Sequence, residues 1–172
     1  EIAADMFVAA ERLDSSENHA TNICYAYAKA GRKDRSKEWA KRAHERQPSA
    51  VTAFNLSCDA TGKEQESLLR QALDLDANIP DALLLLGKLL KRSSNQEGDE
   101  MIEKCIRILN RQLDSHLISK DGCRNLIAAA EINNNQDIAA KAKARLESFN
   151  DAPVYDEDNL VSTTGQLSLL AR

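Results

Sequence analysis

The sequence predicts an all-α fold built from antiparallel helical hairpins, and three observations lead to this prediction. Residues that break helices are scarce, since the 172 residues include only 6 glycines and 3 prolines. Apolar residues recur at the three- and four-residue spacings of helices that bury one face. Short runs of breaking and capping residues interrupt this pattern at intervals that suit a helix followed by a tight turn.

The composition limits the classes of function. The chain is 42% hydrophobic and 29% charged, with 4% aromatic residues, so we expect an aliphatic, alanine-rich core. The net charge of −4 disfavours a general nucleic-acid binder. No apolar run approaches the ~18 residues of a membrane span, and no signal peptide is recognised, so a cytoplasmic location is expected. The chain begins at Glu1 in what reads as the middle of a helix, so we expect it to be cut from a longer protein.

The first two helices are predicted on either side of a capping segment. Residues 1–14 have helical periodicity, and residues 14–16, Asp-Ser-Ser, offer capping oxygens. The second helix should end near Ala30, because Gly31 suits the left-handed residue that follows many helices. The apolar faces of these helices are expected to carry Ile2, Met6, Phe7, Ala10 and Leu13, and then Ala20, Ile23, Cys24, Tyr27 and Ala28.

The next two helices are predicted from their end residues. Asp34 is placed to cap a helix that ends before Pro48, and Ser49 begins another that ends near Gly62. The residues expected to be buried in them are Trp39, Ala40, Ala43, Val51, Phe54 and Cys58.

The stretch 72–87 reads as a helix end, a turn and a helix start. A helix over 64–75 is followed by turn residues 76–79, and Pro80 lies in the opening turn of the next helix, with Asn78 or Asp81 placed to cap it. Turns are expected near residues 93–95 and 133–135. Each of the last four helices is expected to bury one apolar face, formed in chain order by Leu83, Leu84, Leu86 and Gly87; by Met101, Ile102, Cys105, Ile106 and Leu109; by Cys123, Leu126, Ile127 and Ala130; and by Ile138, Ala139, Ala142 and Leu146.

A repeat of about 34 residues underlies these hairpins. Cys24 and Cys58 lie 34 residues apart at the predicted small, buried position of a first helix, and Gly87 fills that position 29 residues later. The chain over residues 1–149 resembles the tetratricopeptide-repeat family in this spacing and in its Pro48. The resemblance implies a right-handed α-solenoid of about four hairpins that acts as a protein-binding scaffold. In the second helices the small position is expected at Ala43, Ala72 and Cys105.

The resemblance also implies a concave groove lined by the first helices. The partner, a protein or peptide, is expected to be acidic, because lysines and arginines lie among the groove positions. Thr21, Tyr25, Asp81 and Leu85 depart from the relatives that clamp a chaperone carboxylate, so that subclass is disfavoured. The expected partner-binding residues are Asn22, Tyr25, Lys29, Asn55, Asp59, Lys88, Lys91, Arg92, Arg124 and Asn125.

No catalytic or metal-binding pattern stands out, so we expect neither an enzyme nor a bound cofactor or metal. The glycines are scattered singly, which excludes a phosphate-binding loop, and no cysteine or histidine pair has ligand spacing. Cys123 and His116 are the one pair that invites a nucleophilic reading, and their spacing is weak support for it.

Two parts of the chain are predicted, a repeat domain over 1–150 and an acidic linker and tail over 151–172. The tail is expected to include a short helix after Ser162 and to dock on the groove or cap the last hairpin. Three alternative functions stay open: an accessory domain of a larger enzyme, a self-assembly module, and RNA binding by a related helical-repeat family.

Overall fold

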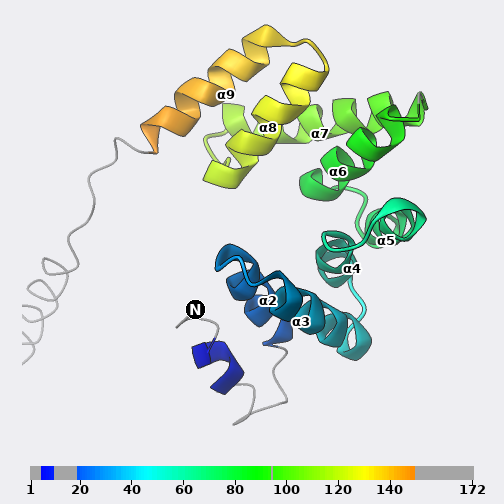
Figure 1. Ribbon diagram of the computed structural model, residues 1–172. Helices are drawn as coiled ribbons and strands as arrows, with labels where there is room; N and C mark the ends of the chain where they lie inside the picture. The colour runs from blue at the N-terminus through cyan, green and yellow to red at the C-terminus, as the bar shows by residue number, and fades with distance from the viewer. Residues whose placement is uncertain (1–4, 10–18, 94, 150–172) are drawn as a thin grey trace, which may run out of the picture.

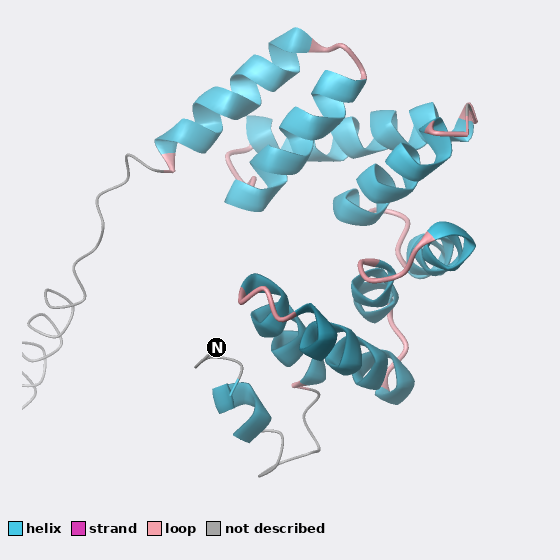
Figure 2. Ribbon diagram, in the orientation of Figure 1, coloured by secondary structure: helices cyan, strands magenta, loops and turns pink. Residues whose placement is uncertain are grey.

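The computed structural model describes residues 5–9, 19–93 and 95–149, and every regular element in these ranges is a helix (Figures 1 and 2). Residues 5–9 are helical, in line with the helix expected over 1–14. The predicted capping segment 14–16 and the tail 151–172 lie outside the described residues. The prediction of an all-α fold is therefore confirmed for the part of the chain that the structure describes.

Four antiparallel hairpins follow one another along the chain (Figure 1). The hairpins pair α2 (Ala20–Lys29) with α3 (Lys33–Arg46), α4 (Ala50–Ser57) with α5 (Gly62–Leu75), α6 (Pro80–Lys91) with α7 (Glu97–Asp114), and α8 (Lys120–Ile132) with α9 (Gln136–Ser148). Each second helix also packs on the first helix of the next hairpin. This stacking buries the apolar faces that a single hairpin leaves open, as the repeat prediction requires.

Several helix ends form as the sequence predicts. Gly31 has a φ of 72°, the left-handed conformation that follows α2. Ser49 caps α4: its Oγ accepts from the Thr52 backbone N–H at 3.2 Å, while the Thr52 hydroxyl oxygen accepts from the Ser49 backbone N–H at 2.8 Å. Pro80 occupies the first position of α6. Local sequence therefore fixes three of the junctions.

Two predicted caps are wrong. The helix α3 begins at Lys33, directly after the Gly31 turn, so Asp34 lies inside the first turn and caps nothing. At α6 neither Asn78 nor Asp81 provides a side-chain cap, because the Asp76 carboxylate accepts from the Asn78 backbone N–H at 2.9 Å and shapes the preceding turn. Asp34 and Asp81 still lie where a negative charge favours the positive end of a helix dipole.

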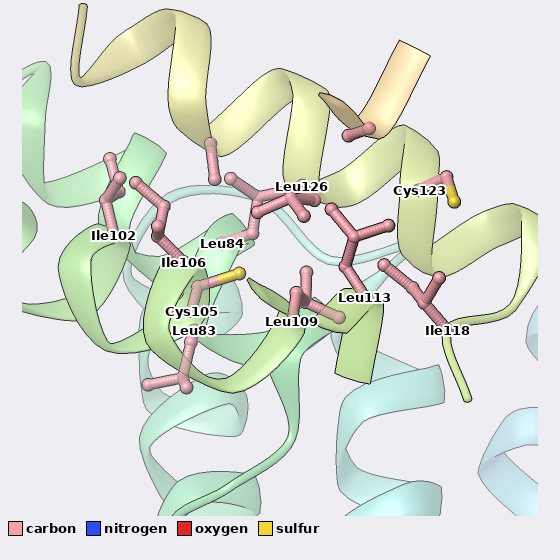
Figure 3. Packing of buried hydrophobic residues seen from close by; sticks show 12 residues of the cluster. Leu83, Leu84, Ile102, Cys105, Ile106, Leu109, Leu113, Ile118, Cys123 and Leu126 are labelled. Atoms are coloured by element: carbon pink, nitrogen blue, oxygen red, sulfur yellow. The ribbon is translucent and has the colours of Figure 1, made fainter. Parts of the chain in front are cut away.

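Three apolar clusters form the core. The N-terminal cluster joins α2 to α3, the middle cluster joins α4, α5 and α6, and the C-terminal cluster joins α6 to α9 (Figure 3). The buried members of the C-terminal cluster are Leu83, Leu84, Ile102, Cys105, Ile106, Leu109, Leu113, Ile118, Cys123, Leu126, Ala129 and Ala142. Those of the N-terminal cluster are Ala20, Ile23, Cys24, Trp39, Ala40 and Ala43, and those of the middle cluster are Ala53, Leu69, Ala72, Ala82, Leu86 and Leu90.

The predicted burial of Cys58 is wrong, and the reason is one of register. The helix α4 ends at Ser57, so Cys58 lies just past it and is exposed. Ser57 is fully buried, and its hydroxyl donates to the carbonyl of Phe54 at 2.6 Å. The counterpart of Cys24 is therefore Ser57, 33 residues on. The predictions for Val51 and Ala28 are also wrong, because both side chains face solvent. Met6 and Phe7, whose apolar positions fit the helical period, are exposed as well.

Two glycines lie at a close contact between α6 and α7. A Cβ atom at Gly87 would lie 2.7 Å from Cγ1 of Ile102. A Cβ atom at Gly98 would lie 2.8 Å from the Lys91 backbone nitrogen and 2.9 Å from the Gly87 carbonyl oxygen. The small-residue prediction for Gly87 is confirmed, because any side chain there would push the two helices apart.

The array curves so that its first and last described hairpins approach each other. Figure 1 shows the hairpins arranged along a curve, with α4 nearer to its inside than α5 and α8 nearer than α9. The C-terminal end of α2 faces the N-terminal end of α8, where Lys29 Nζ lies 3.5 Å from Asp121 Oδ2. We call the side of the array that faces the inside of this curve the concave surface, and the predicted partner site requires such a side.

Candidate functional site

Four side chains from α2 and α8 form a cluster across the mouth of the concave surface. Asp121 is held by Lys29 at 3.5 Å and by Arg124, whose Nη1 donates to Oδ1 at 2.6 Å. The Lys29 ammonium also lies 5.2 Å from the centre of the Tyr25 ring. The structure thus brings the predicted residues Tyr25, Lys29 and Arg124 together through a carboxylate that the sequence analysis did not include.

The charges of this cluster reinforce one another. The Arg124 hydrogen bond lowers the pKa of Asp121 against the opposing effect of partial burial, and the Lys29 charge adds to the lowering. The Tyr25 hydroxyl, and then Asp121, raise the pKa of Lys29. Both charges are therefore kept at neutral pH. The two side chains are more than half exposed, so water screens the bridge and its contribution to stability is small.

Asn125 connects α8 to α6. Its Nδ2 donates to Oδ1 of Asp81 at 2.7 Å, across 44 residues of sequence. Asp81 forms no ion pair within the described residues. The predicted residue Asn125 thus helps to fix how the third and fourth hairpins sit together.

The three predicted cations of α6 have different surroundings. Lys91 forms an ion pair with Asp99 of α7, which holds it at its own hairpin turn. Lys88 is half-buried and Arg92 is exposed at the C-terminal end of the helix. Neither Lys88 nor Arg92 makes an ion pair with any residue that the structure describes. These two side chains, one helical turn apart, are the charges on α6 that a partner could engage.

The remaining predicted residues are Asn22 on α2, Asn55 on α4 and Asp59 just past the end of α4. Asn22 is exposed, and Asn55 and Asp59 are half-buried. Asp59 lies near Cys24, because its charge adds to the burial that raises the pKa of that thiol. No hydrogen bond or ion pair in the described part of the chain joins these three side chains to the cluster around Asp121.

Asp121 is the residue that the sequence analysis missed. It lies in the first turn of α8, directly after the Ser119 cap, whose Oγ accepts from the Gly122 backbone N–H at 3.0 Å. Its spacing of three residues from Arg124 was a usable indication of their contact. The contact with Lys29 follows from the curvature of the whole array, which local spacing does not encode.

The cysteines do not form a reactive site. Burial raises the pKa of Cys105 to about 12, and burial also raises the pKa of Cys24 and Cys123, so these thiols stay protonated at neutral pH. Cys123 is free and buried, and no hydrogen bond joins it to His116 in the described ranges. Within those ranges no group of three His, Cys, Asp or Glu side chains is placed to hold a metal ion.

A second, smaller feature lies on the outer side of the array, between α5, α6 and α7. A cleft of about 310 Å³ is lined by apolar side chains that include Leu73, Leu86 and Met101. Arg70 of α5 spans its edge and donates to both carboxylate oxygens of Glu97 on α7, at 2.6 and 2.8 Å, and to Glu66 at 3.0 Å. This bidentate pair ties the second hairpin to the third.

None of the helices in the described ranges combines the length and the apolar character needed to cross a bilayer.

The comparisons with known proteins bear on the fold. No protein-family model and no curated protein matches the chain. Among solved structures, the crystal structure of MamA, a tetratricopeptide-repeat-like protein, is similar, with a TM-score of 0.54 and 17% sequence identity over 86% of this chain and 89% of that one. At this identity the likeness shows the fold, which is that of a helical-repeat solenoid of the tetratricopeptide type.

Proposed function

We propose that this chain is a non-catalytic scaffold that binds an extended segment of a partner protein along its concave surface. The observation that carries the proposal is the curvature that places Lys29 of the first described hairpin 3.5 Å from Asp121 of the last. A segment lying inside this curve touches several hairpins at once, so many weak contacts add to a specific one. The helical-repeat fold supports the same proposal, since stacked hairpins create surfaces of this kind.

The side chains that the proposal assigns to the concave surface favour an acidic segment. Lys88 and Arg92 lie one turn apart on α6 without a carboxylate partner in the described residues, and both can donate hydrogen bonds to carboxylates. Asn22 and Asn55 offer both a donor and an acceptor to a peptide backbone. Tyr25 is 58% exposed and supplies an aromatic surface of the kind that anchors partners.

The test of this proposal reverses the charges on α6. Acidic peptides selected from a random displayed library against the wild-type protein provide the probe, and Lys88→Glu with Arg92→Glu is the variant. We expect binding to weaken about tenfold or more, equivalent to at least ~1.4 kcal/mol, because two charge-assisted contacts become repulsive. The thermal melt followed by circular dichroism should stay almost unchanged, since both changes are at the surface.

The matched control reverses two cations on outer helices, Lys37→Glu on α3 with Lys63→Glu on α5. Both side chains are exposed, and the total change in charge equals that of the test variant. The control should bind the peptides as the wild type does. If the α6 variant binds as tightly as the wild type, or if the control loses as much affinity, the proposed site is wrong.

A further inference from the structure

An open depression at the end of the array, which we call the end cavity, stands apart from the concave surface. It measures about 420 Å³ and lies between the C-terminal end of α7 and the last described helix, α9. Two of the side chains around it are cations, and one is a carboxylate, Asp114, which accepts from Asn110 Nδ2 at 3.1 Å. The residues that line it are Leu113, Asp114, His116, Lys141, Ala144 and Arg145.

Arg145 is left incompletely bonded beside this cavity. Its guanidinium lies 4.6 Å from the centre of the Phe149 ring, and Nη1 donates to the Ser148 hydroxyl at 3.3 Å. Its Nε is buried and has no hydrogen-bond partner, a condition that no other buried side-chain nitrogen or oxygen shares in the described part of the chain. A buried donor without an acceptor is unfavourable, and Arg145 makes no ion pair with a described residue, so its guanidinium lacks a carboxylate partner there.

Arg70 is an arginine of an earlier outer helix whose guanidinium has carboxylate partners. Its Nε donates to Glu66, and its two terminal nitrogens donate to Glu97, which the next outer helix supplies. Arg145 lies on α9, and no further outer helix follows among the described residues. Lys141, one turn earlier on α9 and exposed, also makes no ion pair with a described residue. The last hairpin therefore has two cations, Lys141 and Arg145, without a carboxylate partner among the described residues, whereas Arg70 of the second hairpin is paired with two carboxylates.

The chain itself continues with carboxylates of the matching charge. Residues 151–158, Asp-Ala-Pro-Val-Tyr-Asp-Glu-Asp, contain four acidic side chains and no cation. Lys141 lies about 10 Å along the helix axis from Ser148, at ~1.5 Å per residue, and an extended chain covers that distance in about three to four residues. A tethered segment also has an effective concentration on the order of millimolar, so a weak site is occupied.

We propose that the acidic segment 151–158 binds the end cavity in the same molecule, with its carboxylates accepting hydrogen bonds from Lys141 and Arg145. The segment takes the place that Glu97 takes for Arg70, and it caps the last hairpin without adding another helix pair. The proposal does not depend on the partner site, because none of its residues lies on α2, α4, α6 or α8.

Carbodiimide cross-linking of the full chain tests this proposal directly, since it joins only an amine and a carboxylate that touch. Peptide mass spectrometry should find Lys141 joined to a carboxylate of 151–158. Lys143 is the internal control: it lies two residues on, is similarly exposed, and donates to Glu131 at 2.8 Å, so it should link to Glu131 and not to the segment. A mixture of isotopically labelled and unlabelled chains should show that the link forms within one molecule.

Two perturbations make the result decisive. The variant Arg145→Gln should reduce the Lys141 link at least threefold, whereas the matched variant Arg107→Gln, on α7, should leave it unchanged. In the wild type, ~1 M salt should reduce the link as well, because the screening length falls to about 3 Å; this arm needs no variant to fold. A Lys141 link no more frequent than that of Lys143, a link formed only between molecules, or a yield indifferent to both perturbations would overturn the proposal.

Discussion

The two ends of the array bury different kinds of residue. The C-terminal cluster across α6 to α9 consists mostly of leucine and isoleucine and is continuous over two hairpins. Half of the buried members of the N-terminal cluster are alanine, and all of its buried members lie on α2 and α3, with Val8 and Leu56 packed against them. Because the stabilisation from burial grows with apolar area, at about 25 cal/mol per Å², each buried residue contributes more at the C-terminal end.

This difference predicts which hairpins unfold locally at a low free-energy cost and which unfold only at a high cost. In a repeat protein, each hairpin is stabilised by itself and by its neighbours, so free energies of local unfolding vary along the chain. We expect the C-terminal hairpins to unfold together and the N-terminal hairpin to open first. A concave surface that spans both ends can then adapt at α2 while α6 and α8 stay fixed.

The largest expected effect comes from Leu126→Ala, in the middle of the C-terminal cluster. Leu126 is fully buried, so the variant loses transfer energy and leaves a cavity, at a cost of about 2–5 kcal/mol in the free energy of unfolding. Urea unfolding followed by circular dichroism measures it. Leu117→Ala is the control, because Leu117 is 80% exposed and should change stability by less than about 0.5 kcal/mol. If the two variants lowered the free energy of unfolding equally, the C-terminal cluster would not be the more stabilising end of the array.

The second prediction concerns the close contact between α6 and α7. A Cβ atom at Gly98 meets backbone atoms of Lys91 and Gly87, which cannot rotate away. Gly98→Ala should therefore cost about 3 kcal/mol, the upper end of the usual range for overpacking. At Gly31 a Cβ atom meets nothing within 4 Å, and only its left-handed φ opposes substitution, so Gly31→Ala should cost about 1–2 kcal/mol. A thermal melt in which Gly31→Ala is the more harmful change would contradict this account of the contact.

The third prediction tests the corrected repeat register in the N-terminal half. Cys24 is buried, with its Sγ 3.5 Å from the Ser36 hydroxyl, so Cys24→Leu should overpack the α2–α3 contact and cost about 1–2 kcal/mol. Cys58→Leu should change stability by less than about 0.5 kcal/mol, because Cys58 is exposed. If urea unfolding shows that both variants are destabilised alike, Cys58 occupies a buried position, as the 34-residue spacing predicts, and the corrected register is wrong.

The smallest expected effect lies at the junction of the two halves. Hydrogen bonds from Arg70 lower the pKa of Glu97. The ion pair therefore contributes its full stabilisation at pH values above the ordinary glutamate pKa of about 4.3. This stabilisation is lost as the pH falls through the lowered pKa. The side chains are 40% and 32% exposed, so solvent screening limits the loss from Glu97→Gln to about 1 kcal/mol at pH 7.

Urea unfolding at pH 7 and at pH 3 measures this dependence. The stability gap between the wild type and Glu97→Gln should narrow at pH 3. Glu103→Gln, which breaks an exposed pair with Arg107 at 3.8 Å, should show almost no gap at either pH. A gap for Glu97→Gln of the same size at both pH values would mean that the ion pair does not stabilise the junction.

The order of the helices and most of their buried faces could be predicted from the sequence, because both follow from local periodicity and local caps. Ile23, Trp39, Leu83 and Ile102 are buried as expected. The predicted register of α4 is wrong because the 34-residue spacing matches Cys58 to Cys24, whereas the helix ends one residue earlier, at Ser57. Val51 was expected inside because it is apolar, but the first turn of α4 leaves it 52% exposed.

The candidate site was predicted less completely than the fold. The sequence placed Tyr25, Lys29 and Arg124 on inner helices, but it could not show that α2 and α8 meet across the curve. That meeting depends on small angles between successive hairpins, which accumulate over the array and which no local residue pattern specifies. For the same reason Asp121 was missed, and the pairing of Lys91 with Asp99 was not foreseen.

The central claim is that partners bind the concave surface, and backbone amide shifts measured by NMR test it most directly. An acidic peptide selected against the wild-type protein is titrated into isotopically labelled protein, and the shifted amides are assigned to helices. We expect the largest shifts on α2, α4, α6 and α8, centred near Lys88 and Arg92, and shifts near the detection limit on α3, α5, α7 and α9. Shifts concentrated on the outer helices, with the amides around Lys88 and Arg92 unmoved, would contradict the claim.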